Sequence, residues 1–553
     1  MTDRATKERE HFFGAAKIVA GITMLSRVLG LVRDIAIVAF GANRATDTFW
    51  TAFRVPNVFR RLFGEGALSA AFVPVFTETA ETNGWEHARV VLANCFGLLS
   101  LLLAAIVLVI EVILVGLLLL APGQWDRTLL IQLVMIVFPF MITICLLALG
   151  SAALNCRGHF AYPAFAPILL NLFLISGAWV AYRTFGGGQW QGLFTLSISV
   201  VLAGAAQLAG VIWLLRRVRL AALPTIRPVA PEVKRIASMT LPMMVPLGIM
   251  QISSLFEGFY AWLMSAKTTG ECLTVFGLSI SKPLQAGVIT CLYAAERLYN
   301  FPLGIMAVSL ATAVFPLFAR YAARQDIAGL RDATNRALRL SLFLGVPSGV
   351  ALMLLARPAA VLIYRHGGFH ASDAARAAFI LQMYCLGMWA YFCRHILLRA
   401  FFAQKNIVTP LKISCAMAAV NVLLVATLVF TPLRGGAIGL AAAITATAST
   451  LLLAWALHTR LGQLGLRSIM VSLTRIFAAT ALMTLVMLVT AHFAAGLAES
   501  AKLSAAVVVA AGVLAGGCTF LISAALLRSP ELGELWGAIR SRTSRAGGNQ
   551  RRV

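Results

Sequence analysis

The chain has 553 residues, of which 60% are hydrophobic and only 12% are charged, and its mean hydropathy is +0.86. Soluble domains carry about 25% charged residues, so this composition excludes an ordinary soluble protein and indicates a membrane protein. The formal net charge is +25, but the basic residues gather in every second connection between apolar stretches and in the C-terminal tail, the pattern that sets membrane orientation. We therefore expect no nucleic-acid partner, and we expect both termini in the cytoplasm.

Apolar stretches recur along the whole chain and predict about fourteen helices of the length that spans a hydrocarbon core. Backbone groups in lipid must be satisfied internally, so the predicted fold class is an all-α polytopic membrane protein; a β-barrel would show short alternating segments. The predicted helices cover residues 13–41, 46–80, 90–121, 127–155, 160–183, 190–216, 233–265, 286–322, 335–364, 373–403, 406–430, 435–460, 470–496 and 502–527.

The first predicted helix carries polar residues at mid-depth, namely Ser26, Arg27, Arg33 and Asp34. A cation at the bilayer centre costs about 2.5–3.5 kcal/mol, so we expect Arg27 to face a polar cavity rather than lipid. On an ideal helix Arg33 points about 120° away from Arg27, so both reach one cavity only if the helix bends. We expect Asp34 to lie at the interface and reach water.

The second predicted helix carries a polar stripe, because Asn57, Arg61, Glu65 and Ser69 recur every four residues. Arg61 and Glu65 have the i,i+4 spacing of a helical ion pair. Arg60 lies about 100° around the helix and lacks such a partner, so it is the freer cation for a ligand. The residues expected to support the cavity are Ser26, Asn57, Arg61, Glu65 and Glu296.

Later helices place further charges in apolar surroundings. Glu296 and Arg297 are neighbours in the predicted helix 286–322, where they either face the ligand or form a structural pair between helices. Glu111 and Glu257 are lone acids, and each must be protonated, paired or bound to a cation. Arginines within the predicted helices imply an anionic cargo, whereas a transporter of cationic drugs would show an acidic cavity.

The chain repeats part of its own sequence. The segment 67–76, ending in VPVF, resembles 309–318, which ends in FPLF, and residues 160–163 resemble 407–410. In each pair, the two similar segments occupy the same place in a set of six helices, which indicates an internal duplication. The alternative is chance similarity between apolar sequences. We expect two six-helix lobes related by a pseudo-two-fold axis, plus two C-terminal helices. The expected domains are 1–220 for the N-lobe, 221–465 for the C-lobe, 466–528 for the last two helices and 529–553 for a basic cytoplasmic tail.

No catalytic motif stands out in the chain. The sequence has neither a GxxxxGK[ST] phosphate loop nor a GxSxG nucleophile motif. We therefore expect a transporter rather than an enzyme. Without a visible ATP site, net movement would need a potential, an ion gradient or consumption of the product.

Several segments together resemble the MurJ (MviN) family of lipid II flippases. The matching segments run in order through most of the chain: SRVLGLVRD at 26–34, ATD at 45–47, PNVFRR at 56–61, GEGALSAAFVP at 64–74, PAFAPILLN at 163–171 and ERL at 296–298. The resemblance implies the multidrug/oligosaccharidyl-lipid/polysaccharide exporter fold working by alternating access. It implies transport of undecaprenyl-diphosphate-linked peptidoglycan precursor, lipid II, from the inner to the outer leaflet of the bacterial cytoplasmic membrane.

The resemblance also implies roles for particular residues. Arg27, Arg33, Arg60 and Arg297 would bind the lipid-linked diphosphate, and Asp47 would be functionally important. The last two helices would form a groove for the polyprenyl tail. The expected partners are this precursor, membrane lipids and cell-wall synthesis machinery, and the protein is expected to be a monomer. Two alternatives stay open: an exporter of another polyprenyl-diphosphate-linked glycan, and a non-transporting scaffold for cell-wall assembly with the same fold.

The chain departs from the family pattern in two places. About twenty extra residues near 266–286 intervene between helices seven and eight, on the predicted outer side. Glu257 stands where some members place an aspartate that helps to bind sodium, and Asn421 matches another ligand of that site. Met417 stands where a polar ligand is expected. A sodium ion is therefore the one cofactor that the resemblance suggests.

Overall fold

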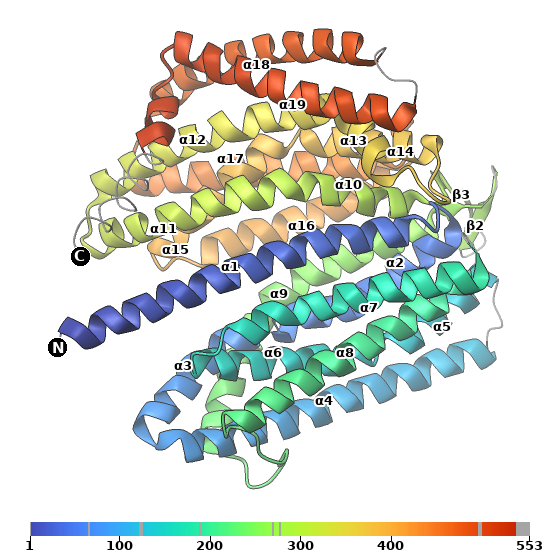
Figure 1. The fold of residues 1–553 in the computed structure, drawn as a ribbon, viewed down its shortest axis with the longest axis vertical. Coiled ribbons are helices and arrows are strands. Elements are labelled where there is room, and N and C mark those ends of the chain that lie inside the picture. The colour runs from blue at the N-terminus through green and yellow to red at the C-terminus, as the bar shows by residue number, and fades with distance from the viewer. Residues whose placement is uncertain are drawn as a thin grey trace. The chain divides into compact units, whose positions relative to one another are not determined.

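Helices dominate the computed structural model, which describes residues 2–64, 67–120, 125–186, 190–267, 270–275, 278–495 and 500–537 (Figure 1). Each of the predicted segments is helical over most of its length, some of them as two or three consecutive helices. Among the described residues, ten helical segments are long and apolar enough to cross a membrane. The predicted class, an all-α multi-pass membrane protein, is confirmed.

The chain forms two compact units, and unit 1 comprises Met1–Thr290 with the short segment His366–His370. Its helices are α1 (Thr2–Val38), α2 (Arg44–Phe59), the π-helix η1 (Arg60–Gly64), α3 (Ala67–Thr82), α4 (Gly84–Leu120), α5 (Trp125–Val137), α6 (Phe140–Cys156), α7 (Ala161–Phe185), α8 (Gly192–Arg217) and α9 (Pro231–Leu263). Its strands are β1 (Ser265–Ala266), β2 (Cys272–Val275), β3 (Leu278–Ser281) and β4 (Leu284–Gln285).

Unit 2 comprises Cys291–Arg365 and Ala371–Val553, and α10 (Val288–Pro302) leads into it from unit 1. Its other helices are η2 (Leu303–Ala307), α11 (Val308–Ala323), α12 (Ile327–Leu354), α13 (Ala356–Tyr364), α14 (Ala371–Cys385), α15 (Met388–Ala403), α16 (Val408–Leu428), α17 (Gly436–Leu461), α18 (Leu466–Ala495) and α19 (Ala501–Leu526). A further helical segment covers residues 530–537.

The boundary between the two units does not follow the predicted lobe boundary at residue 220. The reason is that α9 packs against α2 and α3, and so belongs to unit 1. Compactness and sequence repetition are different criteria, since a helix of one repeat can pack on the other. The division into lobes at residues 220 and 465 therefore stays a prediction.

Two π-helices recur at matching places in the chain. They begin 243 residues apart, at Arg60 and Leu303, which is close to the spacing of the sequence echo. Each precedes a 16-residue helix with an internal proline, Pro74 in α3 and Pro316 in α11. A π-turn widens the helix and leaves it poorly hydrogen-bonded, and such turns occur often at functional sites. The recurrence supports a common origin of the two segments.

Small residues let helices approach closely in unit 2. Small residues are buried on several sides of α17: Ala437, Gly439, Ala441, Ala443 and Ala446. A Cβ atom at Gly439 would lie 2.7 Å from the carbonyl oxygen of Ile380 in α14, so only glycine permits this approach. Lipid tails supply no hydrophobic drive between helices, so such close packing is what holds them together.

The extra segment near 266–286 forms a small β-structure. Strands β2 and β3 pair antiparallel, and β1 pairs in parallel with β4 to close the base of the segment. Lys282 Nζ lies 2.5 Å from Glu271 Oε1, and the backbone N–H of Lys267 donates to Glu271 Oε2 at 2.7 Å. The insertion is therefore a hydrogen-bonded hairpin that follows α9.

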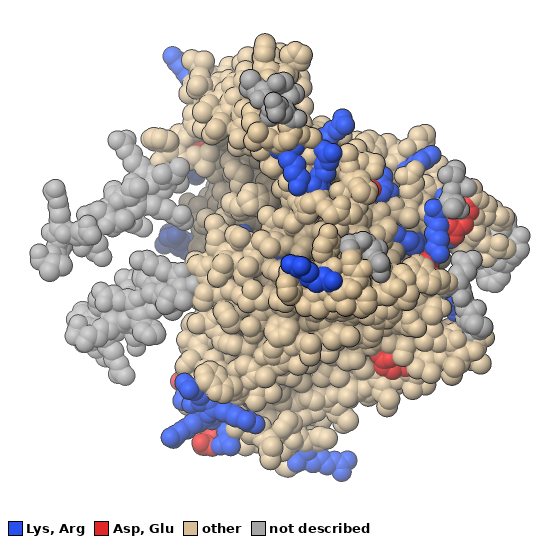
Figure 2. Space-filling model, turned by 45° about the vertical axis from the view of Figure 1, so that its right-hand side comes forward, with Lys and Arg blue, Asp and Glu red and all other residues tan. Residues whose placement is uncertain are grey.

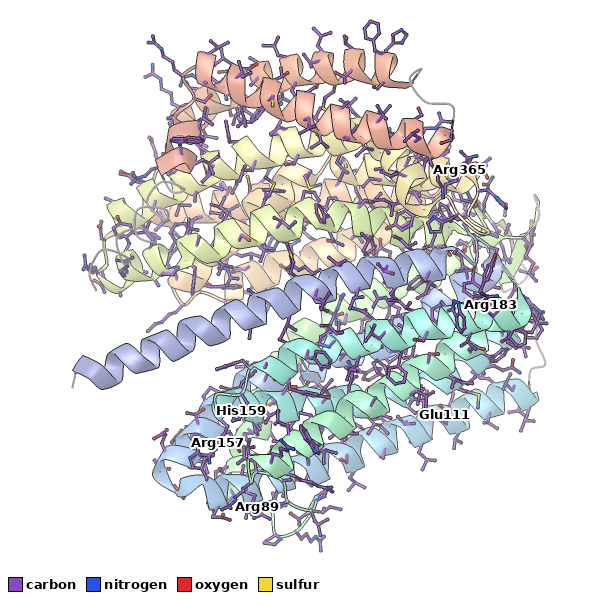
Figure 3. The ribbon with its side chains drawn as sticks, in the orientation of Figure 1. Arg89, Glu111, Arg157, His159, Arg183 and Arg365 are labelled. Atoms are coloured by element: carbon purple, nitrogen blue, oxygen red, sulfur yellow. The ribbon has the colours of Figure 1, made fainter. Side chains whose placement is uncertain are left out.

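Charged side chains occupy a small part of the surface, and most of the face in Figure 2 consists of other residues. In unit 1, Arg89, Arg157 and His159 lie at one end of the helices and Arg183 lies at the other (Figure 3). Glu111 lies between these ends on α4, and its Oε1 is buried without a hydrogen-bond partner among the described residues. Leu108 and Val112 beside it are 65% and 63% exposed, as expected for a lipid-facing helix.

Candidate functional site

A buried polar cluster joins α1 to α7 in unit 1. The Arg33 guanidinium donates to Asp34 Oδ1 through Nε (3.0 Å) and a terminal nitrogen (2.7 Å), and to Asn171 Oδ1 at 2.9 Å. The Asn171 amide nitrogen in turn donates to the carbonyl oxygen of Ser26 at 3.0 Å. Arg33 is 8% exposed and Asp34 only 1%. The expectation that Asp34 reaches water is therefore wrong, because an ion pair with its sequence neighbour allows it to be buried.

Arg27 differs from Arg33 in its surroundings. It is exposed on α1, and no carboxylate of the described residues lies within ion-pair distance of it. It stands eleven residues before the end of α1 at Val38, which is about 16 Å along a helix axis and about half of a 30 Å hydrocarbon core. The mid-depth position of Arg27 in the membrane stays a prediction.

The arginines after α2 lie in the π-helix η1. Arg60 is half-buried and Arg61 is exposed, and both have partners within the chain. The predicted pair of Arg61 with Glu65 cannot be described, because Glu65 lies outside the described residues. Asn57, predicted to support the cavity, donates its side-chain amide to the carbonyl oxygen of Phe53 at 2.8 Å, one turn back in its own helix.

Asp47 caps the first turn of α10. Its Oδ2 accepts from the backbone N–H of Gly287 at 2.7 Å, and its Oδ1 accepts from both the N–H and the hydroxyl of Thr290 at 2.8 Å. Asp47 is fully buried. A carboxylate at a helix N-terminus satisfies N–H groups that lack an intrahelical partner and interacts favourably with the helix dipole. Asp47 therefore holds the start of the helix that carries Arg297.

Arg44 anchors the N-terminal end of α2 and was not among the predicted site residues. It is buried, stacks 4.3 Å above the Trp262 ring, and donates from Nε to Asp126 Oδ2 at 3.1 Å. It also donates to the carbonyl oxygen and the hydroxyl of Ser265. Lys267 Nζ lies 2.9 Å from the other Asp126 oxygen. This cluster joins α2, α5 and the segment that follows α9.

In unit 2, Glu296 and Arg297 have separate partners. Arg297 is exposed, donates to the Tyr293 hydroxyl and lies 4.8 Å from the centre of the Tyr293 ring, one turn earlier in α10. The Tyr384 hydroxyl of α14 donates to Glu296 Oε1 at 3.4 Å. The Tyr299 ring lies 5.4 Å from the Tyr384 ring, so aromatic side chains line the Glu296 side of α10.

The two predicted sodium ligands lie in different units. Glu257 is half-buried on α9 in unit 1, and Asn421 lies on α16 in unit 2. The Thr445 hydroxyl of α17 lies 3.5 Å from Asn421 Oδ1, which places two oxygen donors of the kind that hard cations bind side by side. No group of three or more His, Cys, Asp or Glu side chains among the described residues could hold a metal ion.

Sequence reasoning missed the residues that hold the charged side chains in place. Asn171 is a single amide in an apolar helix, which is a costly position and therefore a usable signal. Gly287 and Thr290 give no local signal, because their importance comes from Asp47, which is more than two hundred residues away in the chain. Tyr384 reads as an ordinary aromatic residue of a buried helix.

Comparison with known proteins gives one consistent result. A protein-family model described as "Lipid II flippase MurJ" matches residues 37–519. A probable lipid II flippase MurJ from Rhizobium tropici is 32% identical over 410 residues, which cover 73% of this chain and 73% of that protein. The lipid II flippase MurJ from Burkholderia cenocepacia is 30% identical over 468 residues, covering 81% of this chain and 84% of that protein.

Solved structures show the same fold. One described as "Lipid II flippase MurJ, inward closed conformation" matches with a TM-score of 0.71 and 22% identity, covering 92% of this chain and 98% of that chain. An inward-facing MATE family transporter of the MOP superfamily matches with a TM-score of 0.63 and 14% identity, covering 81% of this chain and 98% of that chain. At these identities the likeness concerns the fold alone, and it confirms the predicted fold class.

Proposed function

Because the chain belongs to the MurJ family of lipid II flippases, we propose that it moves lipid II from the inner to the outer leaflet of the cytoplasmic membrane by alternating access. It is a transporter rather than an enzyme. The cargo is a diphosphate joined to a sugar head and a polyprenyl tail. The tail can remain in lipid, while the charged head must cross a layer in which an unpaired charge is costly.

The observation that carries the proposal is the position of Arg27. It is an exposed cation on α1, it is predicted to lie at mid-depth, and no carboxylate among the described residues lies within ion-pair distance of it. Facing lipid, it would cost about 2.5–3.5 kcal/mol, so a polar cavity with an anionic cargo is the better explanation. Guanidinium groups stay charged and bind phosphate oxygens in a forked geometry. Arg60 in η1 and Arg297 on α10 would supply the further cations.

The contacts divide the predicted site residues into two groups. Arg27, Arg60 and Arg297 are proposed to bind the diphosphate. Arg33 and Asp47 are proposed to position the helices, because Arg33 is paired with Asp34 and Asn171 and Asp47 caps α10. A substitution at Arg33 or Asp47 would then lower transport through helix position rather than through direct loss of a ligand contact.

The membrane arrangement follows from the charge pattern. We propose that both termini face the cytoplasm and that the hairpin of β2 and β3 faces outward, since the basic connections alternate with nearly neutral ones. A monomer that works beside the cell-wall synthesis machinery is part of the same proposal. The apolar pair α18 and α19 is proposed to provide the groove for the polyprenyl tail.

Sodium coupling is a separate proposal, supported in unit 2 by the neighbouring side-chain oxygens of Asn421 and Thr445; Glu257 of unit 1 is the predicted carboxylate. If transport in vesicles were the same in sodium-free medium, and Glu257→Ala had no effect, sodium coupling would be rejected while the flippase function stood.

The function is tested by depleting the protein from cells and measuring how much lipid II is accessible from the outer face of the membrane. Depletion should lower outer-leaflet lipid II and raise the inner-leaflet pool, and wild-type protein should reverse both. Arg27→Gln should fail to restore them at normal membrane level. Arg216→Gln, an exposed cation at the end of α8, is the matched control and should restore them fully. Unchanged outer-leaflet lipid II on depletion would favour a scaffold instead.

A further inference from the structure

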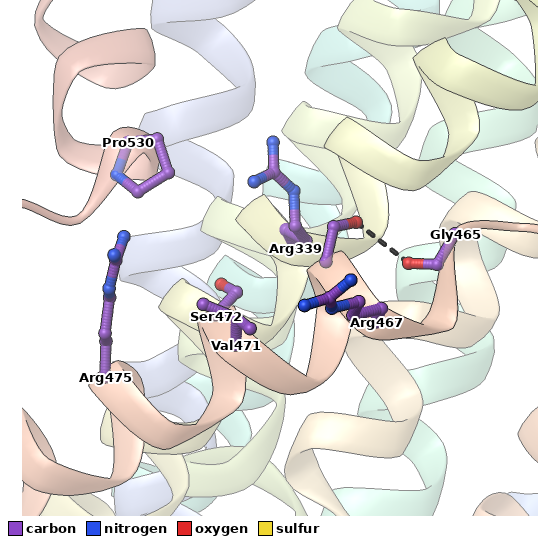
Figure 4. A pocket seen from close by; sticks show the side chains of 8 residues that line it. Arg339, Gly465, Arg467, Val471, Ser472, Arg475 and Pro530 are labelled. Carbon is purple, nitrogen blue, oxygen red and sulfur yellow. Dashed lines mark hydrogen bonds between the residues drawn. The ribbon is translucent and has the colours of Figure 1, made fainter.

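A second cationic site lies in unit 2, away from the arginines discussed so far. A cavity of about 460 Å³ opens beside the first two turns of α18. Three arginines line it: Arg339 of α12, and Arg467 and Arg475 of α18 (Figure 4). Ser468 and Ser472 lie between Arg467 and Arg475 on α18, and Pro530 lies on another side of the cavity. The cavity is large enough for a phosphodiester with its glycerol.

The charge of this cavity is only partly balanced. Arg339 lies 3.4 Å from Glu531 and 3.6 Å from Glu534, both long for an ion pair, and its Nε is buried with no hydrogen-bond partner among the described residues. Arg467 and Arg475 have no carboxylate within ion-pair distance in the described chain. Arg475 donates a hydrogen bond to the carbonyl oxygen of Arg528 at 3.2 Å. The cavity therefore keeps a positive charge.

The cavity is built by specific hydrogen bonds at the start of α18. Asn335 of α12 donates to the carbonyl oxygen of Gly465 at 3.2 Å and accepts from the Ser468 hydroxyl at 3.1 Å. The Ser472 hydroxyl donates to Glu531 Oε1 at 2.8 Å, and Glu531 is fully buried. These bonds fix α12, α18 and the segment that begins at Ser529 around one space.

Apolar side chains stand next to the cavity on the outside of α18. Leu466, Met470 and Val471 are exposed by 56%, 59% and 47%, and Trp536 near the chain end is 67% exposed. A free phosphate would use only the cations, whereas a phospholipid would use the cations for its headgroup and these side chains for its acyl chains. Basic pockets between membrane helices on the cytoplasmic side bind anionic headgroups in this way.

We propose that the cavity of Arg339, Arg467 and Arg475 binds the phosphate headgroup of an anionic phospholipid of the surrounding membrane. The bound lipid would hold the first turns of α18 to α12 and to the segment after α19. This lipid-binding site is separate from the proposed diphosphate site, so the proposal does not depend on whether the protein transports lipid II.

The test uses full-length protein in detergent and native mass spectrometry with added phosphatidylglycerol or phosphatidylcholine. Wild-type protein should retain phosphatidylglycerol in preference to phosphatidylcholine. Arg467→Gln/Arg475→Gln should weaken this binding about tenfold or more, because two charge-assisted contacts are lost. Arg216→Gln/Arg217→Gln, an equal charge change at the end of α8, should leave it unchanged. Equal loss in both double variants would mean general surface attraction and overturn the site, as would no loss in the first.

A second arm separates the two sources of phosphate. Binding of inorganic phosphate to the same protein is measured by titration calorimetry. Inorganic phosphate is then used to compete with phosphatidylglycerol for the protein. Weak binding that fails to displace the lipid supports the proposal, while full displacement at comparable affinity shows a free-anion site and overturns the lipid assignment. If the double variant unfolds, the single variant Arg467→Gln is used, because Arg467 is exposed and its side chain forms no ion pair or hydrogen bond with the described residues.

Discussion

Asp47 offers a quantitative test, because its buried carboxylate accepts three hydrogen bonds at the start of α10. Asp47→Asn replaces one acceptor oxygen by an amide nitrogen, so at least one donor of Gly287 or Thr290 loses its partner. A buried donor left unsatisfied costs about 1–3 kcal/mol. Asp47→Ala leaves all three donors without an acceptor and should cost about 3–5 kcal/mol, as when one partner of a buried charged contact is removed.

Hydrogen–deuterium exchange with mass spectrometry measures this effect where it arises. Each 1.4 kcal/mol is a factor of ten in an opening equilibrium, so Asp47→Asn should speed exchange of the peptide that spans 287–290 by about 5- to 150-fold. Asp332→Asn is the control, because Asp332 is exposed and its contact with Arg331 is weak. Unchanged exchange at 287–290 in both Asp47 variants, with the protein folded, would refute the capping role.

Three further predictions concern other contacts. Asn171→Leu leaves the buried guanidinium of α1 with one fewer acceptor and should lower the free energy of unfolding by about 1–3 kcal/mol in mixed micelles with SDS; a loss below about 0.5 kcal/mol would contradict it. Gly287→Ala should destabilise far more than Gly270→Ala: both have φ near +90°, but a Cβ at Gly287 would collide with a backbone carbonyl of the α1–α2 turn, while Gly270 faces open space. Burial raises the pKa of Glu271, but the hydrogen bond from Lys282 and a backbone N–H outweigh it and hold that pKa below its ordinary value. The pair therefore supports the hairpin at neutral pH, and this support is lost as the pH falls through the lowered pKa, below about 4.3; limited proteolysis of the hairpin between pH 6 and pH 3 should show this, and Glu271→Gln should remove the pH dependence.

The helices could be predicted from the sequence because each is specified locally. An apolar stretch of about twenty residues must be helical in lipid, whatever it packs against. The mid-depth position of Arg27 follows in the same way, since the number of residues along a helix sets the depth. The free-energy cost of placing a charge in the bilayer was enough to identify Arg27 as unusual, without knowledge of any partner.

The partners of charged residues could not be predicted, because they come from distant parts of the chain. The sequence placed Asp34 at the interface, but Arg33 and Asn171 make burial favourable, and Asn171 is 138 residues from Arg33. The same holds for Asp47, whose donors lie beyond the hairpin insertion. Helical spacing describes neighbours on one helix; contacts between helices depend on packing, which the sequence pattern does not specify.

The central claim, that this chain carries lipid II with Arg27 and Arg297 as phosphate-binding cations, is tested most directly in vesicles. Purified protein is reconstituted with labelled lipid II, and the labelled head that reaches the opposite leaflet is measured with and without an imposed membrane potential. Wild-type protein should move lipid II, and Arg27→Gln/Arg297→Gln should lower the rate at least about tenfold, as expected from loss of charge-assisted phosphate contacts, with no change in stability. Equal rates for both proteins, or no movement by the wild type, would contradict the claim.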